Sequence, residues 1–271
     1  MNTHFFSRVF ECLMITDPEL KVNKTYQCFD DLTAGRFIFD HGSEVVKIPV
    51  PGRPAKPELV DPRAVSRRSI NSTEGRSILA HAVAHIEFNA INLALDAAYR
   101  FRGMPDDFYT DWMKVAKEEA YHFSLMTAYL KRHGCRYGDF TAHNGLWEMA
   151  LKTDHNLLER MALVPRVLEA RGLDVTPGMI KKLENAGDMA FVDCLKIIYE
   201  EEIGHVAIGS RWFFYCCKIA EVDSRTTFIN LLKQHMNSGL RGPFDEWSRL
   251  QAGFTELEMS DLKLLEDGLK N

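Results

Sequence analysis

Residues 117–123, Lys-Glu-Glu-Ala-Tyr-His-Phe, and residues 201–206, Glu-Glu-Ile-Gly-His-Val, each contain a glutamate that is followed three residues later by a histidine. The two pairs are Glu119 with His122 and Glu202 with His205. Residues three apart on a helix lie on the same side, so each pair can direct a carboxylate and an imidazole toward one point. The doubled pattern predicts two helices that present the same two ligand types.

Each pair is preceded at a nearly equal distance by another glutamate. Glu87 lies 32 residues before Glu119, and Glu169 lies 33 residues before Glu202. Four helices that bring together four carboxylates and two imidazoles can form a six-ligand dinuclear metal site inside a four-helix bundle. We therefore predict metal ligation by six residues: Glu87, Glu119, His122, Glu169, Glu202 and His205.

The residues around these glutamates support buried positions. An ionised carboxylate on an apolar helix face is costly unless it is paired or bound to a metal. Glu119 and Glu202 both lie on largely apolar stripes, and the stripe of Glu87 contains no polar residue: Ala80, Val83, Ala84, Ala90, Ile91, Ala94 and Ala98. Too many negative charges meet here for ion pairing alone, so a cation is the simplest compensation.

The ligand on the third helix has three candidates, Glu148, Glu159 and Glu169. Polar and charged residues flank Glu159, whereas Glu169 restores the equal spacing between the two halves. Gly103 lies midway between Glu87 and Glu119, and Gly187 lies close to the midpoint of Glu169 and Glu202, so both antiparallel hairpins would turn at a glycine. We favour Glu169 and leave Glu159 as the alternative.

We do not predict that the other polar residues near the proposed ligands bind metal. Glu118, Glu200 and Glu201 have no histidine three residues later, and Glu118 shares a side with polar residues. His81 and His85 lie off the face of Glu87, so we expect outer-shell or surface positions for them. Tyr121 and Tyr199 are expected to pack rather than to react.

The chain divides by its patterning into three segments. Residues 1–70 contain one or two short helices, broken near Asp17-Pro18, and a proline-rich strap that cannot be a regular helix. Residues 71–220 carry the bundle, and residues 221–271 form a further helical extension in which Ser260 is a candidate cap. The helices expected for the bundle are 77–101, 106–132, 145–171 and 188–218, with turns at 103–105 and 133–134 and a break at 172–177.

The composition is that of a soluble globular protein, with 46% hydrophobic and 26% charged residues. A net charge of −5 gives no overall basic field for nucleic acid. The apolar stretches are interrupted by charges, so we expect no membrane association. The six cysteines show no Cys-x-x-Cys spacing, and we expect reduced core thiols in a cytoplasmic protein.

Four runs of sequence resemble the ferritin-like superfamily. These are residues 81–96, 117–123, 160–178 and 201–213, and they are similar to a bacterial family of ferritin-like proteins of unknown function. More distantly, residues 117–123 and the Leu-Glu-Ala-Arg run at 168–171 resemble the di-iron tRNA hydroxylase. The resemblance implies an all-α ferritin-like four-helix bundle, places a ligand pair on Glu119 and His122, and independently favours Glu169.

Mixed carboxylate and imidazole ligands without thiolate suit iron or manganese. We therefore expect two iron ions, with iron and manganese together or manganese alone as alternatives, in an oxidoreductase that activates dioxygen to hydroxylate or otherwise oxidise a substrate. A small molecule or a modified nucleoside would be the substrate, and an electron-donor protein would be a partner. The alternatives are a ferroxidase-like protein that handles iron or manganese, and a metal-free helical binding module.

Overall fold

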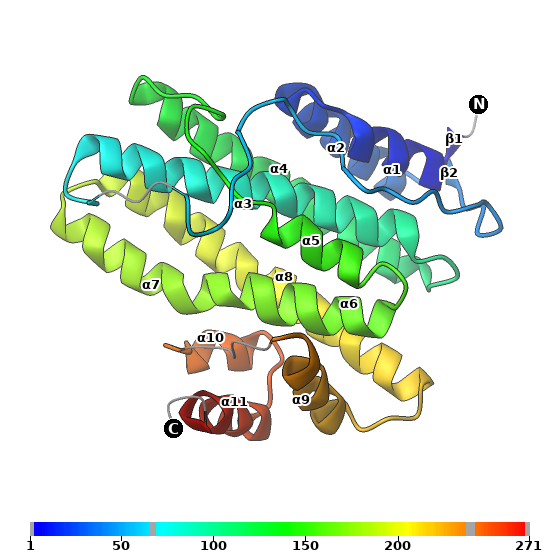
Figure 1. The fold of residues 1–271 in the computed structure, drawn as a ribbon. Coiled ribbons are helices and arrows are strands. Elements are labelled where there is room, and N and C mark those ends of the chain that lie inside the picture. Colours follow the sequence, from blue (N-terminus) through cyan, green and yellow to red (C-terminus); the bar gives the residue numbers. More distant parts are fainter. Residues whose placement is uncertain (1–2, 66–68, 237–241, 269–271) are drawn as a thin grey trace. The chain divides into compact units, whose positions relative to one another are not determined.

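A computed structural model describes residues 3–65, 69–236 and 242–268 of the chain (Figure 1). Within these ranges the protein is all-α, as expected, and its only strands are two short ones that pair in parallel. The chain forms two compact units, residues 1–151 with 186–194 and residues 152–185 with 195–271. The boundaries expected from the sequence, 1–70, 71–220 and 221–271, remain a prediction.

The first unit is built on a long antiparallel hairpin of two helices. Gly103 turns this hairpin with a φ of +73°, a conformation that only glycine adopts readily. Three shorter helices, two strands and the strap also belong to this unit. The elements are β1 (Thr3–His4), α1 (Phe5–Met14), α2 (Pro18–Thr33), β2 (Phe37–Ile38), α3 (Thr73–Arg100), α4 (Asp106–Arg132) and α5 (Gly145–Lys152).

The second unit contains a long arm of three consecutive helical segments, most of the last bundle helix, and the C-terminal extension. The arm consists of α6 (Leu157–Leu163), the π-helix η1 (Val164–Glu169) and α7 (Ala170–Asn185). The helix α8 (Met189–Ile219) begins in the first unit and continues through the second. The extension consists of α9 (Ser224–His235), α10 (Glu246–Gln251) and α11 (Glu256–Gly268).

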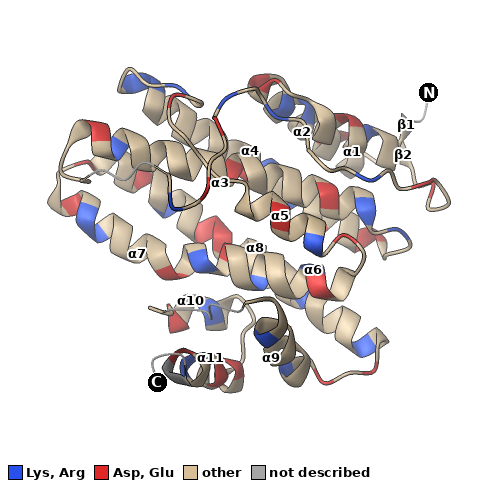
Figure 2. Cartoon of the chain, in the orientation of Figure 1, with Lys and Arg blue, Asp and Glu red and all other residues tan. Residues whose placement is uncertain are grey.

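Helix α3 is the core helix of the first unit. It is long and apolar enough to cross a membrane by length and composition, the only such helix in the described ranges, but 83% of its most apolar window is buried inside the protein. This burial is that of a core helix in a soluble protein, whereas the cytoplasmic location remains a prediction. Figure 2 shows acidic and basic residues interspersed along the helices.

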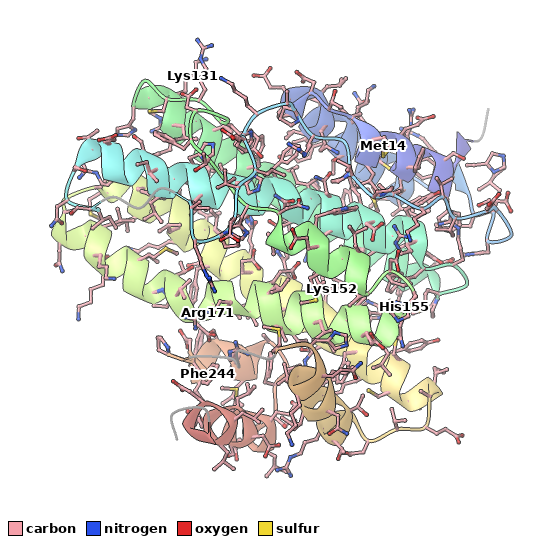
Figure 3. All side chains as sticks on the ribbon, viewed as in Figure 1. Met14, Lys131, Lys152, His155, Arg171 and Phe244 are labelled. Atoms are coloured by element: carbon pink, nitrogen blue, oxygen red, sulfur yellow. The ribbon has the colours of Figure 1, made fainter. Side chains whose placement is uncertain are left out.

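The N-terminal segment matches the sequence expectation. The helices α1 and α2 are separated near Asp17, whose side chain accepts a hydrogen bond from the Leu20 amide (2.8 Å) and caps α2, while Pro18 occupies the first helical turn. The strap passes close to the end of α1, where the Gly52 amide donates to the Leu13 carbonyl (3.0 Å) beside Met14, labelled in Figure 3. A Cβ on Gly52 would lie 2.3 Å from the Met14 carbonyl carbon, so only glycine fits there.

A buried lysine ties α1 and α2 to the core helix. The Lys21 ammonium is fully buried and donates to the carbonyls of Cys12 (3.0 Å) and Leu13 (2.7 Å) and to Asn92 Oδ1 (2.8 Å). It thereby donates to two carbonyls in the last turn of α1, where a helix leaves carbonyls without an intrahelical amide partner. Burial lowers the pKa of Lys21 to about 7.

Replacement of Lys21 by methionine is expected to destabilise the protein by about 2–4 kcal/mol, because it removes three hydrogen bonds from a buried charged donor, including the one that Asn92 Oδ1 accepts. Chemical denaturation of Lys21→Met checks this value. Lys24→Met is the matched control, since Lys24 lies one turn later and donates to the Gln27 side chain at the surface (2.9 Å). Equal stabilities of the two variants would contradict this role of Lys21.

Three sequence expectations about local structure are corrected. The helix expected at 145–171 is interrupted, because α5 ends at Lys152 and the arm starts again at Leu157. The break expected at 172–177 is absent, because α7 continues through Pro177. Ser260 lies inside α11 and caps nothing; Thr255 fills that role by accepting a hydrogen bond from the Glu258 amide (3.1 Å).

All six cysteines are free thiols, as the sequence indicated. Cys12 lies on α1, and its thiol donates to the Lys24 carbonyl of α2 (3.5 Å).

Candidate metal centre

The first half of the predicted ligand set comes together in the hairpin of α3 and α4. Glu87 lies at the middle of α3, and Glu119 and His122 lie one turn apart on α4. The Nδ1 atom of His122 is 3.3 Å from Glu87 Oε2 and 3.3 Å from Glu119 Oε2. Two carboxylates and one imidazole nitrogen therefore converge, which is the first half of the predicted site.

These three side chains are withdrawn from water. Glu119 and His122 are fully buried, and Glu87 is 3% exposed. The apolar stripes predicted around Glu87 and Glu119 are buried as well. The sequence pattern therefore correctly identified the inward face of both helices.

The carboxylates of this cluster repel each other in the absence of a cation. Burial first, and then the charge of Glu119, raises the pKa of Glu87 well above its usual range, and His122 offsets only part of this effect. A bound cation would lower the pKa of both carboxyl groups, because it favours their ionised form. The electrostatics are therefore those expected for a metal-binding site.

The second Glu-x-x-His pair has similar internal geometry. On α8, His205 Nδ1 is 3.7 Å from Glu202 Oε2. His205 is fully buried and Glu202 is 8% exposed. Again the imidazole presents Nδ1 toward the carboxylate of its own pair.

The third predicted helix ligand, Glu169, is the last residue of η1 and is partly buried. The alternative residue, Glu159, takes part in other pairs: its Oε2 atom is 3.8 Å from His155 Nε2 and 3.7 Å from His235 Nε2. Glu148 is exposed on α5. Glu169 therefore remains our predicted ligand.

His81 and His85 are corrected from a possible surface position to a buried one. Both serve as anchors for the loop between α4 and α5. The Gly138 amide donates to His81 Nε2 (2.9 Å), while His85 Nε2 donates to the His143 carbonyl (3.0 Å) and His85 Nδ1 accepts from the Tyr137 hydroxyl (2.9 Å). Burial lowers the pKa of each imidazole to about 4, so both are neutral.

The other residues considered in the sequence analysis lie near the surface or have a packing role. Glu118 forms a surface ion pair with Lys114 (3.7 Å), and Glu200 is exposed. Tyr121 is 41% exposed. The Tyr199 hydroxyl donates to Asp245 Oδ2 (2.9 Å), which indicates a packing role.

The sequence analysis missed the π-helix η1 and its buried Arg166. In η1 the Ala170 amide donates to the carbonyl of Pro165, five residues earlier. Proline lacks the amide hydrogen and its ring disfavours a regular helical turn, so Pro165 was the available signal. Single turns of this kind occur frequently at functional sites.

Glu87, Glu119, His122 and Glu202 are all buried and could hold a metal ion. Their donor atoms are carboxylate oxygens and an imidazole nitrogen, which are common metal ligands. The fold and these residues define a helical-bundle protein with a candidate metal site.

The chain belongs to the family described as Protein of unknown function (DUF455), which matches residues 14–260. It is also 42% identical over 279 residues to an uncharacterized protein of Haemophilus influenzae, covering 99% of this chain and 97% of that protein. No solved structure matches the chain.

Proposed function

We propose that this protein holds a carboxylate-bridged pair of metal ions, as in ferritin-like bundles. The observation that carries the proposal is the convergence of Glu87, Glu119 and His122 in a buried cluster, where a bound cation would stabilise the ionised carboxylates. In this proposal Glu169, Glu202 and His205 supply the ligands of the second half. The pairing of each histidine with a glutamate one turn earlier supports equivalent roles for the two halves.

The start of α8 supports this arrangement. Tyr129 of α4 contacts Phe191 of α8, with 4.7 Å between ring centroids, and its hydroxyl donates to Asp188 Oδ2 (2.6 Å). Glu119 lies ten residues before Tyr129, and Glu202 lies eleven residues after Phe191. At about 1.5 Å per residue these two paths have nearly the same length, so antiparallel helices would bring Glu202 level with Glu119.

We further propose that the protein is an oxidoreductase. Two bound iron ions would supply the reduction of dioxygen. In a hydroxylation, one oxygen atom enters the substrate and the other leaves as water, with electrons and protons from a donor protein. The chain's own contribution is to hold both metals with buried carboxylates and to exclude water through the apolar residues around them.

Dioxygen consumption tests the proposed activity. Protein loaded with ferrous iron under nitrogen is mixed with aerated buffer in an oxygen-electrode cell, with and without a chemical reductant. We expect uptake that requires iron and continues only while reductant remains. Iron-loaded protein that consumes no oxygen would overturn the oxidoreductase proposal.

Repeated oxidation of added ferrous iron without an organic reductant would instead favour the ferroxidase-like alternative. A substrate would then be sought by comparing the metabolites and modified nucleosides of cells with and without the gene. Accumulation of an unoxidised precursor in the deletion strain is the expected result.

A further inference from the structure

An arginine of η1 is buried in the second unit, three residues before Glu169. Arg166 is fully buried, and its Nη2 atom donates to Glu258 Oε1 of α11 (2.8 Å). Its guanidinium carbon lies between 4.4 and 5.1 Å from the ring centroids of four aromatic residues, which come from α8, α9 and the turn before α11: Phe213, Phe214, Phe228 and Phe254.

Burial of the Arg166 guanidinium costs free energy that an apolar side chain in the same space would not cost. The Nε and Nη1 atoms of Arg166 are buried and find no hydrogen-bond acceptor in the part of the chain that the structure describes. A guanidinium carries five N–H donors, and burying a charge is costly even beside an acidic partner. An apolar side chain of similar volume would occupy an aromatic pocket at lower cost, so stability alone does not explain an arginine here.

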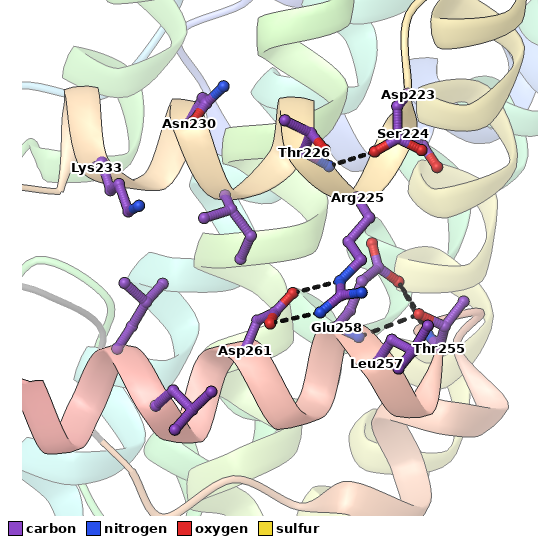
Figure 4. A pocket seen from close by; sticks show the side chains of 13 residues that line it. Asp223, Ser224, Arg225, Thr226, Asn230, Lys233, Thr255, Leu257, Glu258 and Asp261 are labelled. Carbon is purple, nitrogen blue, oxygen red and sulfur yellow. Dashed lines mark hydrogen bonds and ion pairs between the residues drawn. The ribbon is translucent and has the colours of Figure 1, made fainter.

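The partner of Arg166 is itself held in place. Glu258 Oε2 accepts hydrogen bonds from the Thr255 amide (2.9 Å) and the Thr255 hydroxyl (3.1 Å), while the Glu258 amide donates to Thr255 Oγ1 (3.1 Å). This is a capping box at the start of α11. Figure 4 shows Glu258 and Thr255 together at this helix end. The carboxylate therefore offers Arg166 an oxygen at a fixed position.

The π-helix is fixed at a second point one residue earlier. The ring of Pro165 lies directly against α8 at Gly209, where an added Cβ would lie 2.3 Å from the Pro165 Cβ and Cγ atoms. Gly209 is one turn after His205 on the same helix. Pro165 and Arg166 therefore hold η1 against the helix that carries the second Glu-x-x-His pair.

The arm is fastened to the extension again beyond Glu169. Asp174 of α7 and Arg249 of α10 form a fully buried bidentate ion pair (2.8 and 2.7 Å). Arg171, labelled in Figure 3, donates to the Pro243 carbonyl (3.1 Å). Buried partners thus lie three residues before and five residues after Glu169.

The direction of Glu169 depends on the turn that these contacts fix. A π-helical turn contains one residue more than an α-helical turn, so it rotates the residues that follow it about the helix axis by about 100°. If η1 relaxed to an α-helical turn, the residues at its end would point elsewhere. Whatever stabilises η1 therefore sets where the Glu169 carboxylate points.

We propose that Arg166 is a positioning residue: with Glu258 and the four phenyl rings it holds η1 so that Glu169 can ligate a metal beside Glu202 and His205. The proposal rests on the metal centre of the proposed function. It assigns a task to the C-terminal extension, which is to fix one metal ligand through the buried Arg166–Glu258 pair.

The test uses cobalt(II) as the probe, bound anaerobically to the full-length protein and followed by its visible absorption during competition with a chelator. Wild-type protein is expected to bind two equivalents. Arg166→Met is expected to weaken one of the two equivalents by about 10-fold to 100-fold and to change its absorption band, since loss of outer contacts to ligands has effects of this size. The other equivalent should be unchanged.

Two further variants separate positioning from folding. Arg166→Met combined with Glu258→Gln removes the unpaired buried charge, so it should recover thermal stability but not the affinity of the weakened equivalent. Arg225→Met is the matched control: Arg225 on α9 joins α11 through an exposed bidentate pair with Asp261 (2.6 and 2.8 Å; Figure 4). It should bind both equivalents as wild-type protein does.

A folded Arg166→Met protein with two unaltered equivalents would overturn the positioning role while leaving the metal centre intact. A recovery of affinity in the double variant would also overturn it, because the single variant's defect would then reflect a buried charge. Wild-type protein that binds fewer than two equivalents would instead count against the proposed function itself.

Discussion

The double variant His122→Ala/His205→Ala is expected to fold and to lose its bound metal. Both imidazoles are fully buried, and each presents Nδ1 toward the glutamate of its own helix. Contacts that only orient a ligand change metal affinity by about 10-fold to 100-fold, so loss of a nitrogen ligand from each half should weaken binding by more than about 100-fold. Truncation of two buried side chains should leave enough stability for a folded product.

Elemental analysis of the purified variant, together with circular dichroism to establish folding, gives the result. The matched control is His81→Ala/His85→Ala, which also removes two buried histidines, but ones whose hydrogen bonds go to the loop between α4 and α5. This control should keep its metal. A folded His122→Ala/His205→Ala protein with wild-type metal content would refute the ligand assignment.

The substitution Glu87→Gln is expected to raise the stability of the metal-free protein and to lower the stability of the metal-loaded protein. Burial and the charge of Glu119 raise the pKa of Glu87 in the metal-free fold, whereas in the unfolded chain this group titrates near its ordinary value of about 4.3. Between these two pKa values the folded state binds more protons, so stability falls as pH rises through that window. At neutral pH the neutral glutamine should therefore stabilise the metal-free protein.

The same change removes a carboxylate ligand, so it should weaken metal binding and lower the stability gained from metal. Chemical denaturation at neutral pH, with a chelator and then with ferrous iron under nitrogen, measures both effects. Glu118→Gln is the control, because Glu118 forms an ion pair with the exposed Lys114 (3.7 Å), and its replacement should change stability by less than about 1 kcal/mol. A metal-free Glu87→Gln protein less stable than wild type would contradict this electrostatic account.

The sequence predicted those features that depend on local periodicity. The apolar stripes around Glu87 and Glu119 correctly identified the buried faces of α3 and α4. The hairpin glycines were also predictable, because Gly103 and Gly187 adopt φ values of +73° and +74° that other residues avoid. The break at Asp17-Pro18 followed from capping and proline geometry in the same way.

Features that depend on distant partners could not be predicted in this way. The pattern around His81 and His85 placed them off the face of Glu87 but could not show that the loop at 133–144 covers them. Helix α7 continues through Pro177 where a break was expected, and nothing near that proline in the sequence shows that Arg249 binds Asp174 on the same helix. The role of Arg166 likewise depends on Glu258, 92 residues later.

The metal content of the wild-type protein tests the central claim most directly. Protein purified from cells grown with iron and manganese is analysed for elements and for chain concentration, before and after anaerobic reconstitution with ferrous iron. The account predicts two metal ions per chain after reconstitution, with magnetic coupling between them. A folded protein that remains free of metal under both conditions would contradict it.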